Sequence, residues 1–320
     1  MAEFSIIEEF CHGIGPDHAD TKLGVGDDAA IIAVPAGMEL AISADSMVSG
    51  IHFFADVSPA KLAQKILAVN LSDMAAMGAE PKWATLVLTI PEFDADWLKA
   101  FSDSLKVIAT RFNLQIIGGD TTQGPLNLSI TIMGLLSQGQ ALCRSGAMLD
   151  DDVYVSQYVG DAALGLAVLS GEVCLTDEYS DAVVSALETP EPRVTLGQSL
   201  LGVASACLDI SDGLVGDLGH ICQQSRVSID IDAGLIPLSD AYRWFIANGG
   251  TLDLALTGGD DYELAFTASP SQRSEIDCIA EQLGISLTRV GSVVAKRQEA
   301  VSVSLEGVKY QLPTSFEHFS

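Results

Sequence analysis

Short apolar segments and longer amphipathic segments alternate along the first half of the chain. Apolar and β-branched runs of four to eight residues, bounded by polar or glycine-containing segments, predict strands. The strands expected here are Glu39–Asp45, Trp83–Ile90, Leu114–Ile117 and Leu128–Leu135. Residues 58–77 and 97–111 repeat apolar positions with helical spacing, so we predict a helix at each. The polar segment Ser43–Ser46 is expected to be a turn that ends the first strand.

The second half continues the alternation, which predicts an α/β fold throughout. Strands are expected at Val153–Ser156, Ala206–Ile210, near Ile229 and at Glu263–Thr267, with helices from about Ala162, through Cys222, around Ser239–Ile246, and in a helix–strand pair that ends near Val294. The polar residues Arg144–Gly146 and the acidic residues Asp150–Asp152 indicate a boundary between two domains. We therefore expect domains at residues 1–140 and 141–320, in agreement with a length of 320 residues.

The composition excludes several classes of protein. Hydrophobic residues make up 48% of the chain and charged residues 18%, which is sufficient for two buried cores. The formal charge of −27 would repel nucleic acid and an anionic membrane surface, so we expect neither as a partner. The six cysteines have no close pairs, and neither a signal-peptide pattern nor an apolar run of membrane-spanning length is present. A cytoplasmic protein is expected.

Six segments place an aspartate beside a glycine or a small residue at an expected strand end or helix start. They are Gly26–Ala30, Ser43–Asp45, Asn70–Met74, Gly118–Thr122, Asp209–Gly213 and Thr257–Tyr262. Glycine lets backbone N–H groups approach a phosphate, and carboxylates hold hard cations. Any one of these segments alone is more often a turn or a helix cap. Asp73 is different, because an aspartate inside an apolar helical run costs desolvation unless it is paired or bound to a metal.

The common alternatives for binding phosphate or for nucleophilic catalysis are missing from the sequence. No GxxxxGK motif and no GxGxxG motif is found, and no local nucleophile signature accompanies the histidines. Phosphate charge would then be neutralised by metal ions that bridge to aspartates, with Arg144 as the one well-placed cation. His52 either contacts a ligand or caps a turn, and residue statistics favour neither.

The chain resembles thiamine-monophosphate kinases of the PurM-like ATP-binding superfamily over nearly its whole length. The most specific segments are VNLSDMAAMGA at residues 69–79, GGDTTQGP at 118–125 and DISDGL at 209–214. The resemblance implies two PurM-like α/β domains with mixed sheets. The N-terminal domain would bind ATP and metal and form a homodimer. It also implies that ATP phosphorylates thiamine monophosphate to thiamine pyrophosphate with several Mg²⁺ ions.

The same resemblance assigns roles to individual residues. Metal positions are Asp28, Ser43, Ala44, Asp45, Asp73, Asp120, Asp209 and Asp212, and of these Asp73, Asp120 and Asp212 are expected to matter most for catalysis. ATP contacts are Gly119, Asp120, Arg144 and Ser211, and thiamine-phosphate contacts are His52, Asp260 and Phe316. Three positions depart from the family pattern. Ala44 replaces a common Thr, Asp260 replaces a more usual Glu, and Phe316 follows Thr314-Ser315 where Gly and Trp or Tyr are familiar.

A phosphate monoester is mostly a dianion near pH 7, because its second pKa is about 6. Such an acceptor needs no general base, so we expect direct in-line transfer without a phosphoenzyme. Alternatives are another enzyme of the superfamily, of the selenophosphate synthase or aminoimidazole ribotide synthase type, and a non-catalytic nucleotide or metal sensor. An acidic Ca²⁺ scaffold is a further option, but no DxDxDG loop is present.

Overall fold

The computed structural model describes residues 9–10 and 12–312, which form two compact units. The first unit comprises Met1–Met74 and Ala79–Ala141, and the second comprises Ala75–Gly78 and Leu142–Ser320. Each unit has its own sheet, so the expectation of an α/β fold with mixed sheets is confirmed. Within the described part of the chain, no helix has the length and apolar character that a membrane crossing requires.

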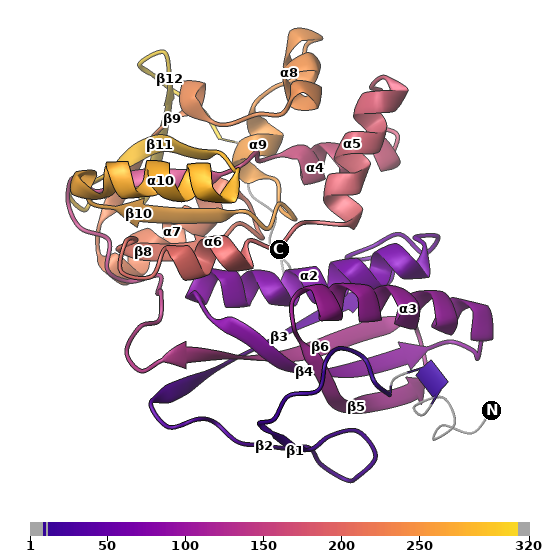
Figure 1. The fold of residues 1–320 in the computed structure, drawn as a ribbon. Coiled ribbons are helices and arrows are strands. Elements are labelled where there is room, and N and C mark those ends of the chain that lie inside the picture. Colours follow the sequence, from indigo (N-terminus) through magenta and orange to yellow (C-terminus); the bar gives the residue numbers. More distant parts are fainter. Residues whose placement is uncertain (1–8, 11, 313–320) are drawn as a thin grey trace. The chain divides into compact units, whose positions relative to one another are not determined.

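The first unit is built on a four-stranded sheet in the order β3-β6-β4-β5. Its strands are β3 (Met38–Val48), β6 (Asn127–Ser137), β4 (Glu80–Ile90) and β5 (Gln115–Gln123). The β4–β5 pair is parallel and joined by a helix, whereas the other two pairs are antiparallel. Two helices, α2 (Pro59–Met77) and α3 (Ala95–Arg111), cover one face of the sheet (Figure 1).

The two faces of this sheet differ in character. On the face covered by helices, Leu86, Leu88 and Ile130 are each less than 5% exposed. At one end of the opposite face, Trp83 is fully buried by residues that include Ile32 of the small β1–β2 ribbon (β1, Thr21–Leu23; β2, Ile31–Ile32). Further along, the opposite face is open: Ile42 is 62% exposed and Val87 is 38% exposed. We call this part of the sheet the open face.

The second unit contains a seven-stranded sheet in the order β13-β12-β9-β11-β7-β10-β8. The strands are β7 (Asp152–Ser156), β8 (Ala206–Asp209), β9 (Ser228–Asp232), β10 (Leu264–Ala268), β11 (Leu287–Val294), β12 (Val301–Leu305) and β13 (Val308–Lys309). Only the β9–β12 pair is parallel among these pairings. The helices are α4 (Asp161–Leu169), α5 (Asp177–Glu188), α6 (Val194–Ser199), α7 (Leu214–Ser225), α8 (Asp240–Ala247), α9 (Asp253–Thr257) and α10 (Arg273–Leu283). A large apolar core that includes Tyr242 and Val290 joins helices to sheet.

Two sequence-based boundaries are wrong. Residues 43–46 are not a turn, because β3 continues through them and Ala44 and Asp45 pair in register with Thr131 and Ile130 of β6. Gly118–Asp120 likewise lie inside β5 instead of following it, since Asp120 pairs with Val87 of β4. In both places, the strand carries polar or small residues that a turn would also tolerate.

Candidate functional site

In the first unit, Asp73 is held by Ser43 of the neighbouring edge strand. The Ser43 hydroxyl donates to Asp73 Oδ2 at 2.5 Å, and Asp73 is half-buried on α2. One turn earlier on the same helix, the buried Asn70 accepts the backbone N–H of Asp45 at 3.2 Å. Asn70 is itself fixed, because its amide donates to the carbonyl of Ile66 at 2.8 Å. These bonds bring Ser43, Asp45 and Asp73 together, and the expected role of Asp73 as a metal ligand stays a prediction.

Asp120 belongs to a different face of the same sheet. Asp120 pairs with Val87 of β4, Val87 pairs with Ser129 of β6, and Ser129 pairs with Ser46 of β3. Paired residues lie on the same face of a sheet, and Ser46 is exposed, so this row belongs to the open face. Ser43 pairs with the buried Ile132 on the helix-covered face. Asp120 and Asp73 thus lie on opposite faces, and β5 and β3 are opposite edges of the sheet. The first unit alone does not bring these two carboxylates together.

Position 119 requires a glycine for steric reasons. Its φ is +152°, and a Cβ at this position would lie 1.8 Å from the carbonyl oxygen of Leu86. No other residue can approach the β4 backbone so closely. The glycine is therefore explained by strand packing, and its expected contact with ATP stays a prediction.

The remaining sequence-selected residues of the first unit lie in exposed or half-buried positions. Asp28 is exposed in the loop between β1 and β2. Ala44 is exposed on β3, where its methyl group offers no oxygen, as the sequence indicated. His52 Nδ1 accepts the backbone N–H of Val48 at 3.0 Å, which is the turn-capping role considered from the sequence. That bond assigns the ring proton to Nε2.

In the second unit, three sequence-selected residues lie where β8 meets α7. Asp209 is buried at the end of β8, Ser211 is half-buried and Asp212 is exposed. The backbone N–H groups of residues 211–213 all donate to Asp217 Oδ2, at 3.0, 3.0 and 3.1 Å. Burial raises the pKa of Asp217 to about 6, although these N–H bonds favour its charged form. Sequence analysis missed Asp217, because an acidic residue in an amphipathic helix attracts no attention.

Asp260 lies on a neighbouring loop that is bonded to the first. Its backbone N–H donates to the carbonyl of Ser211 at 2.9 Å, and its carboxylate accepts the hydroxyl of Tyr262 at 2.9 Å. Asp260 has a φ of +71°, a conformation that most side chains avoid. The structure thus brings Asp209, Ser211, Asp212 and Asp260 into one region of the second unit. Arg144 is exposed, and its carbonyl accepts the hydroxyl of Ser225 at 3.2 Å.

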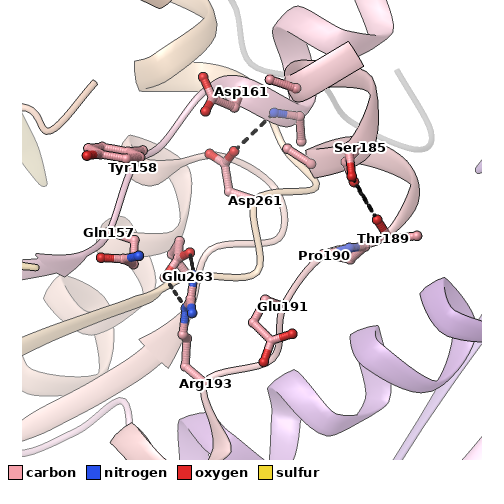
Figure 2. Close-up of a pocket in the computed structure, with 13 residues that line it drawn as sticks. Gln157, Tyr158, Asp161, Ser185, Thr189, Pro190, Glu191, Arg193, Asp261 and Glu263 are labelled. Atoms are coloured by element: carbon pink, nitrogen blue, oxygen red, sulfur yellow. Dashed lines mark hydrogen bonds and ion pairs between the residues drawn. The ribbon is translucent and has the colours of Figure 1, made fainter. Parts of the chain in front are cut away.

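Asp261, the next residue along the chain, lines a pocket of about 260 Å³ (Figure 2). Asp261 accepts the N–H of Gly160 at 2.7 Å, and burial raises its pKa well above the usual range. Glu263 binds Arg193 through both carboxylate oxygens, and the lining also includes Asp161 and Glu191. The pocket is consequently lined by four carboxyl groups, of which Glu263 is paired with Arg193. The doubled aspartate at positions 260–261 was the only sequence indication of it.

The carboxylates do not form a complete metal cage by themselves. Across the described residues, no group of three or more His, Cys, Asp and Glu side chains could hold a metal ion. Oxygen donors of the type that Mg²⁺ prefers are nevertheless present in both units. Phe316 lies outside the described residues, so its expected role stays a prediction.

Comparisons with known proteins agree on one family. Residues 26–136 match the family described as AIR synthase related protein, N-terminal domain. The chain is 43% identical over 320 residues to thiamine-monophosphate kinase from Salmonella typhimurium, which covers 98% of this chain and 96% of the relative. The crystal structure of thiamine-monophosphate kinase from Stenotrophomonas maltophilia K279a superposes with a TM-score of 0.84 at 41% identity and covers 96% of each chain. AaThiL complexed with AMPPCP and TMP has a TM-score of 0.77 at 28% identity, covering 90% of this chain and 89% of that chain.

Proposed function

Since the chain belongs to the thiamine-monophosphate kinase family, we propose that it transfers a phosphoryl group from ATP to thiamine monophosphate, which gives thiamine pyrophosphate and ADP. The observation that carries this proposal is similarity at 43% identity over 98% of the chain to a kinase of that name. Support comes from the solved relative that holds both AMPPCP and TMP. The aspartate-bearing segments of both units supply the oxygen-rich chemistry that such a reaction needs.

Several Mg²⁺ ions fit the donor set. Asp45 and Asp73 in the first unit and Asp209 and Asp212 in the second offer carboxylate oxygens. Mg²⁺ is usually held by one or two carboxylates, with water and substrate phosphates completing its six ligands. When bound, Mg²⁺ neutralises phosphate charge that this acidic chain cannot neutralise with its own cations.

The charge state of the acceptor determines whether the reaction needs a general base. A phosphate monoester is already mostly ionised near pH 7, because its second pKa is about 6, so no side chain has to remove a proton. The remaining task is alignment of acceptor and γ-phosphorus, which direct in-line transfer requires. Arg144, Gly119 and Ser211 would contact the nucleotide in this proposal. Asp73, Asp120 and Asp212 would be the residues on which turnover depends most.

The residues proposed to contact the acceptor are His52, Asp260 and Phe316. His52 carries its proton on Nε2, which can donate to a phosphate oxygen, because Nδ1 is occupied by the N–H of Val48. Asp260, whose carboxylate accepts the hydroxyl of Tyr262, would offer a negative charge to the cationic thiazolium ring. Phe316 would add an aromatic face to the cation.

A homodimer that pairs through the first unit is part of this proposal. The open face exposes Ile42 and Val87 together with short polar side chains, a surface that a partner sheet could cover. Asp120 lies in the same row as Val87 and would then lie at the interface. Asp120 and Asp73 lie on opposite faces of one sheet, so they do not meet within one first unit. In a dimer, residues of the partner subunit could complete a binding site around Asp120. We place the enzyme in the cytoplasm, where ATP is available.

The test is a panel of acceptors with purified protein, ATP and Mg²⁺. Thiamine pyrophosphate should form from thiamine monophosphate, and free thiamine should not react, because its hydroxyl needs a general base. ADP release with selenide or formylglycinamidine ribotide, and none with thiamine monophosphate, would instead assign a selenophosphate synthase or aminoimidazole ribotide synthase activity. No reaction with any acceptor would favour a nucleotide or metal sensor.

A further inference from the structure

Asp217 is a buried carboxylate that serves the start of its own helix. It lies in the first turn of α7 and is 3% exposed. Gly213, at the N-cap position, has no side chain with which to cap the helix. Asp217 Oδ2 reaches back and accepts the N–H groups of Ser211, Asp212 and Gly213 at 3.0–3.1 Å. One oxygen thus satisfies the backbone N–H groups of the two residues before the helix and of its N-cap residue.

This arrangement changes what the Asp209–Gly213 segment can bind. A glycine-containing loop before a helix commonly binds phosphate through backbone N–H groups and the positive end of the helix dipole. Here those three N–H groups point to Asp217, and a carboxylate already occupies the positive end of the helix. The loop N–H groups of this segment are therefore engaged by Asp217, and its free groups include the side chains of Asp212, which is exposed, and Ser211, which is half-buried.

The loop that Asp217 fixes also supports the loop that bears Asp260. The N–H groups of Asp260 and Tyr262 donate to the carbonyls of Ser211 and Ile210 at 2.9 and 2.8 Å. The contact is tight, because a Cβ on Gly259 would lie 2.3 Å from the carbonyl oxygen of Ser211. A shift of the 210–213 backbone would consequently move the Asp260 loop as well.

We propose that Asp217 is a positioning residue for nucleotide and metal binding, which it serves by holding the backbone of Ser211 and Asp212 and so orienting their side chains. The proposal rests on the proposed function, because it assumes that Ser211 and Asp212 face Mg²⁺ and nucleotide. Residues that orient metal ligands without touching the metal typically change affinity by about 10–100-fold when they are replaced. Asp217 has the burial and the bonds expected of such a residue.

The experiment is calorimetric titration of Mg·ADP into the full-length protein, alongside steady-state kinetics. Asp217→Ala should raise the Kd for Mg·ADP at least about tenfold. Asp217→Asn keeps an acceptor oxygen without the charge, so its Kd should lie between those of wild type and the Ala variant. The matched control is Asp94→Ala, which removes an N-cap that accepts the N–H groups of Asp96 and Trp97 on α3 in the first unit. The control should lower the thermal midpoint and leave the Kd unchanged.

The outcomes separate this inference from the proposed function. A folded Asp217→Ala protein, verified by circular dichroism, whose Kd stays within about twofold of wild type would reduce Asp217 to a helix cap and overturn the inference, while the kinase activity would stand. If Asp217→Ala does not fold, Asp217→Asn decides: a Kd raised about threefold or more supports the inference, and an unchanged Kd overturns it. Wild-type protein that fails to bind Mg·ADP would overturn the proposed function, and the inference with it.

Discussion

The ion pair between Glu263 and Arg193 allows a stability prediction with a magnitude. Arg193 Nε donates to Glu263 Oε2 at 2.7 Å and Nη2 donates to Oε1, while the Ser156 hydroxyl donates to Oε2 at 2.5 Å. The two side chains of the pair are 16% and 8% exposed. Glu263→Gln keeps the shape but removes the negative charge that the guanidinium binds through two nitrogens. Loss of one partner of a buried pair costs about 3–5 kcal/mol, and the lower end applies because Gln still accepts one bond.

Urea denaturation followed by far-UV circular dichroism measures this loss as a lower midpoint for unfolding. Lys99 and Asp103 provide the control, since they form an exposed pair at 2.6 Å with side chains 67% and 65% exposed. Asp103→Asn should change the free energy of unfolding by no more than about 0.5 kcal/mol. A Glu263→Gln loss below about 1 kcal/mol, or one equal to the control, would refute the claim that this pair is effectively desolvated.

Three further predictions concern charge, metal and assembly. Hydrogen bonds from Arg273 and Arg289 lower the pKa of Asp152 below its ordinary 3.8, so its stabilising effect is present above that pH and is lost as the pH falls through the folded-state pKa. Asp152→Asn should therefore have a lower urea midpoint than wild type at pH 7, and the two midpoints should converge below pH 3.8. Asp73→Asn should reduce kcat at least about a hundredfold, yet should not lower the thermal midpoint without Mg²⁺, because the amide oxygen can still accept from Ser43. Light scattering should report about twice 33.6 kDa, and Val87→Lys on the open face should shift the protein to a monomer; a fully active wild-type monomer would contradict the dimer.

Much of the fold could be predicted because helices and strands with one buried face repeat apolar residues at regular intervals in the sequence. The helix expected at residues 58–77 is α2, Pro59–Met77, and the strand expected at Val153–Ser156 lies within β7. The errors at residues 43–46 and 118–120 arise where β3 and β5 carry polar or small side chains. There the sequence has no apolar alternation, and only the pairing with β6 and β4 shows that the strands continue.

Candidate site residues were predictable one at a time, but their grouping was not. The apolar run around Asp73 required a partner, and Ser43 is that partner. Nothing in the sequence indicated that Asp120 would occupy the other face of the sheet from Asp73, since that depends on the register between β5 and β4. Asp217 escaped notice for a related reason, because its partners are backbone N–H groups that belong to no particular side-chain motif.

The acidity of the chain gives glycine–aspartate segments a second role. With 43 acidic and only 16 basic residues, not every carboxylate of the chain can be paired with a cation. The fold uses Arg193 for Glu263, but Asp217 and Asp261 are held by backbone N–H groups, including those of Gly213 and Gly160. A carboxylate that accepts several N–H bonds in a buried position stabilises loop geometry without a cation. A glycine near an aspartate in this chain can therefore donate its N–H group to a carboxylate of the protein itself. Such a glycine is a candidate for binding phosphate only if its N–H group is not already bonded to a carboxylate.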